Sequence, residues 1–106
     1  MIYLASPYAH KDPVVMQQRY EEMIIRTNRY YEGNIPAYSP IVHNHPIALR
    51  GNLPRTWTYW ETIDIPVLRL CDELHVHMLE GWKQSVGVTA EIDFAKKAFI
   101  KIVYVP

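Results

Sequence analysis

Apolar residues recur along the chain with two periods, which separate short strands from longer helices. Residues 2–5 form a continuous apolar run that predicts a first buried strand. Asp12 and Pro13 predict a helix start, because aspartate is a favoured N-cap and proline suits the first helical position. Residues spaced by three and four then follow on one helix face: Met16, Tyr20, Met23, Ile24, Thr27 and Tyr31. Gly33 is placed to end this helix.

The rest of the chain continues the alternation of strands and helices. Residues 35–38 predict a second strand, and residues 39–54 are interpreted as a long loop. Residues 57–70 have a helical pattern that Pro66 is expected to kink or divide, since proline removes an interior hydrogen bond. Residues 73–79 alternate like a third strand, and residues 100–105 predict a closing strand. Between them, residues 86–98 predict a helix with this apolar stripe: Val88, Ile92, Ala95 and Phe99.

This alternation predicts an α/β domain over residues 1–106, with a three-layer, flavodoxin-like arrangement. About four parallel strands would form the sheet, with helices on both faces. Right-handed crossovers favour the strand order 2-1-3-4, which places a topological switch between strands one and three. Ligands of such sheets bind beyond the carboxyl ends of the strands at the switch. The loops over residues 6–10 and 80–87 flank that place.

Composition narrows the classes of partner and compartment. The chain is 49% hydrophobic, as in ordinary globular domains, and its 11 basic residues equal its 11 acidic residues. Zero net charge gives no general attraction for a nucleic-acid polymer or an acidic membrane surface. No apolar run approaches the length of a membrane span, and residues 1–5 are too short for a signal peptide. Cys71 is the only cysteine, so we interpret it as a core residue in a reducing, cytoplasmic compartment.

The segment over residues 85–91 is the clearest candidate for chemistry. It follows strand three and opens a helix, whose unpaired N–H groups form an anion site. Gly87 permits close approach of a ligand to the backbone, and Ser85 either caps the helix or donates to a phosphate. Glu91 lies one turn into the helix. It is either a working carboxylate or a solvated glutamate favoured by the helix dipole.

Other candidates face the same crevice. Asp64 would pair with Glu91, as paired carboxylates do in glycosidic cleavage, or would be a surface residue before a helix break. Tyr3 points off the first strand near its end or packs in the core. Ser6 and Tyr8 belong to the loop after that strand, and both are candidate substrate contacts. The aromatic residues Trp57, Tyr59 and Trp60 either stack on a base or pack in the core.

His43 and His45 raise the question of a metal. Zinc sites use three or four ligands, and Cys71 lies in the wrong kind of segment to join these histidines. His75 and His77 share one face of a strand by the period of two. We therefore expect no metal and no cofactor, and we assign His43 and His45 to substrate binding.

Several of these segments together resemble the nucleoside 2-deoxyribosyltransferase superfamily, which includes the 2′-deoxynucleoside 5′-phosphate N-hydrolases. The resemblance covers nearly the whole chain. It rests on residues 2–6, Asp64, residues 71–74 and, most specifically, residues 85–92. The opening residues 5–8, together with residues 43–46 and 81–82, are most similar to a short branch found in phages and bacteria.

The resemblance implies roles for individual residues. Glu91 falls at the family's glutamate nucleophile, Tyr3 at a tyrosine that contacts it, and Asp64 at an aspartate that assists the departing base. Ser85 stands where the hydrolases bind a 5′-phosphate with serine and where the transferases hold a sugar hydroxyl with an acid. In the family, a residue from a neighbouring subunit completes the site. For this chain we expect a homodimer or larger homo-oligomer, because so small a domain cannot easily bury three tryptophans and eight tyrosines, and exposed aromatic patches mark interfaces.

The sequence leaves three hypotheses. The first is cleavage of the N-glycosidic bond of a nucleoside 5′-monophosphate, deoxy or ribose, or transfer of the sugar between bases. The second is a module that binds or sequesters a nucleotide without turnover, because a fold does not guarantee its usual chemistry. The third is a metal-dependent hydrolase that uses His43 and His45.

Overall fold

The computed structural model describes all 106 residues, and its elements alternate as the hydrophobic pattern indicates. In chain order they are β1 (Ile2–Ala5), α1 (Pro13–Glu32), β2 (Ala37–Tyr38), α2 (Pro40–Gly51), α3 (Trp57–Arg69), β3 (Glu73–His77), the 3-10 turn η1 (Trp82–Gln84), α4 (Val86–Lys97) and β4 (Lys101–Val105). All strands are parallel in the order β2-β1-β3-β4. The predicted α/β class and strand order are therefore confirmed.

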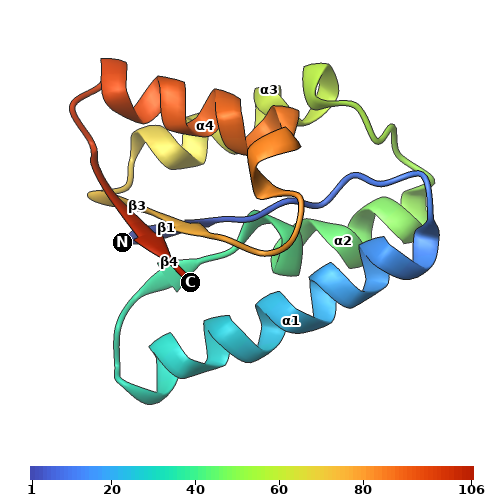
Figure 1. Ribbon diagram of the computed structural model, residues 1–106, viewed down its shortest axis with the longest axis horizontal. Helices are drawn as coiled ribbons and strands as arrows, with labels where there is room; N and C mark the ends of the chain where they lie inside the picture. Colours follow the sequence, from blue (N-terminus) through green and yellow to red (C-terminus); the bar gives the residue numbers. More distant parts are fainter.

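Two layers of helices cover the sheet. Helices α1 and α2 lie on one face, and α3 and α4 lie on the other (Figure 1). Side chains of β1 alternate between these faces. Tyr3 and Ala5 join the core cluster that includes Leu68 of α3, whereas Leu4 packs with Met23 of α1. This alternation aims Tyr3 at the layer in which α4 lies.

Capping residues begin and end α1 where the sequence indicates. The Asp12 side chain accepts a hydrogen bond from the Val14 N–H, and Pro13 occupies the first turn. Gly33 follows the last helical residue and returns its N–H to carbonyl groups of the final turn. Residues 6–12 connect the end of β1 to the start of α1, so this loop lies at the carboxyl edge of the sheet.

Residues 39–54 are not the long loop that the sequence analysis expected, because residues 40–51 form α2. Ser39 caps this helix by accepting the Val42 N–H at 3.2 Å, and Pro40 occupies its first turn. Pro46 removes one internal hydrogen bond, yet the helix continues to Gly51 and packs against α1. Asn52 then ends it in the left-handed conformation, with φ of 49°.

Two smaller expectations are also corrected. Pro66 does not divide α3, because the helix continues past it to Arg69. Phe99 is not on the buried stripe of α4: the helix ends at Lys97, and Phe99 is 95% exposed with φ of 57°. Cys71 is buried in the core cluster, as expected. None of the helices combines the length and the apolar character that a membrane crossing requires.

Candidate functional site

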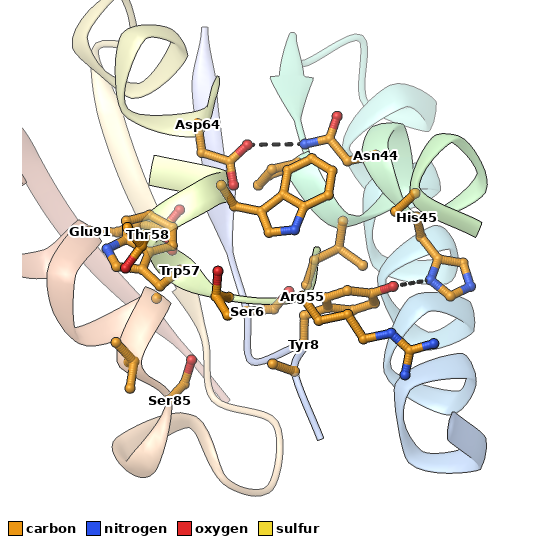
Figure 2. A pocket seen from close by; sticks show the side chains of 18 of the residues that line it. Ser6, Tyr8, Asn44, His45, Arg55, Trp57, Thr58, Asp64, Ser85 and Glu91 are labelled. Atoms are coloured by element: carbon orange, nitrogen blue, oxygen red, sulfur yellow. Dashed lines mark hydrogen bonds between the residues drawn. The ribbon is translucent and has the colours of Figure 1, made fainter. Parts of the chain in front are cut away.

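A cavity of about 470 Å³ opens beyond the carboxyl ends of β1 and β3, at the predicted switch point. Its wall comes from the loop after β1, from α2 and α3, from the linker between them and from the start of α4. The polar residues that line it are Ser6, Tyr8, Asn44, His45, Arg55, Thr56, Thr58, Asp64, Gln84, Ser85 and Glu91. Figure 2 shows these side chains around one space, which brings most of the sequence candidates together.

Glu91 is a buried carboxyl and not a solvated one. It lies in the second turn of α4 with 4% of its surface exposed. The hydroxyl of Tyr3, a fully buried residue of β1, donates to Glu91 Oε2. Burial raises the pKa of Glu91 to about 8; the Tyr3 hydrogen bond opposes that rise, and the nearby charge of Asp64 adds to it. Tyr3 therefore acts from behind the cavity wall, through Glu91.

Asp64 is the second buried carboxyl of the cavity. It lies in the middle of α3 with 7% of its surface exposed. Asn44 Nδ2 donates to Asp64 Oδ1 at 3.0 Å, as Figure 2 shows. Burial raises the pKa of Asp64 to about 6, while the Asn44 hydrogen bond and the nearby His43 lower it. One carboxyl oxygen is thus held by Asn44, and the other is free for a ligand.

His43 lies outside the cavity, contrary to its expected place among the substrate contacts. Its exposed ring packs near Tyr38, with ring centroids 5.7 Å apart. Its Nδ1 lies 2.8 Å from Asn44 Oδ1 and donates to it, because an amide oxygen only accepts. His43, Asn44 and Asp64 therefore form a directed chain that ends at the cavity.

Asn44 is a site residue that the sequence analysis missed. Once residues 40–51 are known to be helical, Ile41, Asn44, His45 and Ala48 stand at the spacing of one helix face, and all four line the cavity. The signal was present in the sequence, but the interpretation of this segment as a loop concealed it.

The start of α4 supplies an anion site. Ser85 caps the helix by accepting the Val88 N–H at 3.2 Å, so its own hydroxyl proton remains free for a ligand. Gly87 serves a packing need as well as ligand approach, because a Cβ there would stand 3.2 Å from Trp57 Cε3. Arg55 is the one lysine or arginine that lines the cavity, whereas Arg50 does not reach it.

Ser6, Tyr8 and His45 complete the wall opposite α4. The Ser6 hydroxyl is buried and has no hydrogen-bond partner within the protein, although Ser6 lines the cavity. The Tyr8 hydroxyl is hydrogen-bonded to His45 Nδ1 (Figure 2). Burial and the nearby Arg55 lower the pKa of His45. A buried hydroxyl without a partner is costly, so the Ser6 oxygen leaves one hydrogen bond still to be made beside the cavity.

No three histidine, cysteine, aspartate or glutamate side chains come together as a metal-binding group. His43 and His45 lie on different faces of α2, so the metal-hydrolase hypothesis gains no support from their arrangement. His75 and His77 share one face of β3, as expected, and both contact the hydroxyl of Tyr30.

Residues 1–105 match the model of a domain of unknown function, DUF1937. No curated protein matches the chain.

Proposed function

We propose, on the premise that the chain belongs to the DUF1937 family, that its cavity binds a nucleoside 5′-monophosphate and cleaves the N-glycosidic bond. The observation that carries this proposal is the pair of buried carboxyls, Glu91 and Asp64, on one cavity wall. Burying two ionisable groups without a cationic partner costs stability, and such pairs concentrate at catalytic sites. Transfer of the sugar to a second base is the close variant of this reaction.

The protonation of the pair suits glycosidic cleavage. With pKa values of about 8 for Glu91 and about 6 for Asp64, the pair holds one proton between these values. Cleavage by a retaining mechanism needs one carboxylate and one carboxylic acid. The higher pKa of Glu91 places this proton mainly on Glu91 in the unliganded protein, whereas the reacting form has it on Asp64. The Tyr3 hydroxyl favours the reacting form, because it stabilises a negative charge on Glu91.

In the proposed reaction, a Glu91 carboxylate oxygen forms a bond to C1′ while the bond from C1′ to the base nitrogen breaks. The electron pair of that bond leaves with the base, and Asp64 gives its proton to the base. A water then attacks C1′, Asp64 takes its proton, and the bond to Glu91 breaks to release the sugar phosphate. Each carboxyl returns to its starting state, so no cofactor is consumed.

The cavity also suits the rest of a nucleotide. The free hydroxyl proton of Ser85 and the N-terminus of α4 favour a phosphate, and Arg55 adds a positive charge. Trp57 and Trp60 contribute aromatic surface to the same wall. The volume of about 470 Å³ lies in the usual range for small-molecule sites.

The first experiment is incubation of the protein with a panel of nucleosides and nucleotides, followed by chromatography for free base. We expect release from at least one 5′-monophosphate, and a loss of about 10³-fold or more in Glu91→Gln, because an amide does not attack C1′. A 2-fluoro sugar analogue should leave its sugar on Glu91, as peptide mass spectrometry would show. A sugar found on Asp64 would reverse the two roles.

Ser85→Asp tests the phosphate contact. Aspartate is as good an N-cap as serine, so the helix start should survive. A second negative charge beside the phosphate should weaken binding of the monophosphate by about 30-fold or more, yet change nucleoside binding little. Ser85→Asn is the matched neutral cap. Equal weakening of nucleoside and monophosphate would show that Ser85 does not contact the phosphate.

A nucleotide-binding module without turnover is the second candidate. It is favoured by the high pKa of Glu91, which leaves this carboxyl mostly protonated near neutral pH in the unliganded protein. If wild type and Glu91→Gln bind a nucleotide equally and neither releases base from any member of the panel, binding replaces catalysis as the function.

We further propose a cytoplasmic homo-oligomer. A single buried thiol suits a reducing compartment, and exposed apolar side chains suit an interface. Phe99, Leu70 and Val86 are 95%, 83% and 68% exposed. Light scattering at micromolar concentration should give at least the mass of a dimer, and a mass near 12.5 kDa would contradict the proposal.

A further inference from the structure

The wall opposite α4 contains a hydrogen-bonded chain that the proposed reaction does not use. It runs from Glu21 and Gln17 on α1 to His45 on α2 and then to Tyr8 in the loop after β1. Gln17 Oε1 lies 3.0 Å from His45 Nε2, and the ring of Tyr20 packs on His45 with centroids 4.3 Å apart. His45 is 4% exposed, so its orientation is fixed by packing as well as by hydrogen bonds.

The direction of each hydrogen bond in this chain follows from chemistry. Gln17 Nε2 faces Glu21 Oε1 at 3.2 Å, and a carboxylate only accepts, so the amide nitrogen is the group on that side. The Gln17 oxygen therefore faces His45 and also only accepts. His45 must carry its proton on Nε2, and burial together with Arg55 keeps the ring neutral. His45 Nδ1 then carries no proton and accepts a hydrogen bond from the Tyr8 hydroxyl.

As a consequence, the Tyr8 hydroxyl already donates its only proton to His45. Tyr8 lines the cavity, yet toward a ligand its oxygen offers only lone pairs. A ligand group that meets this oxygen must itself bring an N–H or O–H. A ring nitrogen or carbonyl oxygen placed there would leave two acceptors facing each other, which costs the desolvation of both.

The part of the ligand that reaches Tyr8 follows from the layout of the cavity. Figure 2 shows Ser85 and Glu91 on one side and the Tyr8–His45 pair on the other. With the phosphate at Ser85 and C1′ at Glu91, the base is the part of the ligand that is left to reach the side of the cavity on which Tyr8 lies. The lining of the cavity also includes Pro40, Ile41, Ala48 and Trp60, which suit a planar, largely apolar ring.

We propose that Tyr8, held as an acceptor by His45, selects nucleotides whose base carries an exocyclic amino group. This inference rests on the proposed function, and it names the substrate class that the same cavity prefers. The amino group supplies the N–H that the Tyr8 oxygen lacks. Bases with hydrogen at that position would leave the oxygen unpaired in a partly buried site.

The test uses the Glu91→Gln protein, so that ligands bind without turnover, and isothermal titration calorimetry. The ligands are the 5′-monophosphates of deoxyadenosine, deoxycytidine and deoxyguanosine, each beside the analogue in which hydrogen replaces the amino group. We expect at least one amino-bearing ligand to bind about fivefold to tenfold more tightly than its analogue, as one neutral hydrogen bond allows. Adding Tyr8→Phe should abolish that ratio while the analogue's affinity stays within about twofold.

Tyr104→Phe is the matched control, because this half-exposed tyrosine lies on β4 and does not line the cavity. It should leave the ratio unchanged. Binding of nucleotides without any preference within the pairs, or an equal effect of Tyr8→Phe on both members, would overturn this inference and leave the proposed function standing. If none of the six ligands binds, this inference fails, and the proposed function fails with it only if the panel of nucleosides and nucleotides also releases no base.

Discussion

Replacing Glu91 with glutamine should make the protein more stable while it removes activity. The substitution keeps the shape of the side chain and an oxygen that accepts from Tyr3. It removes a carboxyl that is 4% exposed and whose pKa rises from 4.5 to about 8. A glutamine has no charge to desolvate, so the folded state loses a cost that grows with pH.

The size and sign follow from linkage between folding and proton binding. In the unfolded chain Glu91 ionises near pH 4.5, whereas the folded protein holds the proton up to about pH 8. Wild-type stability from this group is therefore fully present below pH 4.5, falls as the pH rises, and is lost above about pH 8. A pKa raised this far corresponds to about 5 kcal/mol. Relaxation and water entry reduce such values, so we expect about 3 kcal/mol between about pH 5 and pH 8.

The assay is urea denaturation of wild type and Glu91→Gln at several values of pH. The variant's advantage should be below about 1 kcal/mol at pH 5 and should widen toward pH 8. Glu61→Gln, at an exposed glutamate of α3, is the control and should follow wild type throughout. If wild type and Glu91→Gln keep a constant difference over this range, the carboxyl is not held protonated by burial, and the reasoning is refuted.

Three further results are expected. The pH profile of kcat/KM should be bell-shaped with limbs near 6 and 8, because Glu91 and Asp64 are both protonated below about pH 6 and both ionised above about pH 8. A profile with a single limb would contradict a shared proton. Asn44→Ala should raise the acid limb by about half a unit or more, since it removes the hydrogen bond that favours the Asp64 carboxylate; an unmoved limb would assign Asn44 to folding alone. Burial lowers the pKa of His77 from 6.5 to about 4, so the contribution of neutral His77 to the free energy of unfolding is fully present above pH 6.5 and is lost, by about 3 kcal/mol, as the pH falls toward 4. In denaturation curves, His77→Gln should reduce this loss of stability at low pH.

The fold could be predicted because strong local signals agreed with one another. The apolar run of β1, the Asp12–Pro13 start of α1 and the alternation around β3 each indicate one element type. Short crossovers then leave few arrangements of four parallel strands. The prediction for residues 39–54 was wrong because the segment contains conflicting signals. Ser39 followed by Pro40 favours a helix start, whereas Pro46 and polar residues that are unusual on a buried helix face favour a loop. Packing against α1 decided that competition, and packing partners are not visible in a single segment.

The candidate site was predictable where residue type and place in the topology were enough. Ser85, Gly87 and Glu91 follow from the start of a helix at the switch point. The contact between Tyr3 and Glu91 joins residues 88 positions apart, so no local pattern indicates it, and only the family resemblance implied it. His43 was misplaced because helix α2 directs it away from the cavity while neighbouring Asn44 faces inward.

The distribution of buried polar groups is the strongest physical argument that this cavity has a function. Eight polar or charged residues are buried, and five of them line the cavity: Ser6, Asn44, His45, Asp64 and Glu91. A core that served stability alone would place apolar residues at these positions, because desolvation of each polar group costs free energy unless hydrogen bonds compensate it fully. Compensation here is incomplete, since Ser6 has no partner and both carboxyls have raised pKa values. A ligand with hydroxyl and phosphate groups would complete these interactions. We therefore expect the free energy of unfolding to rise when such a ligand binds, by an amount that follows its concentration relative to Kd.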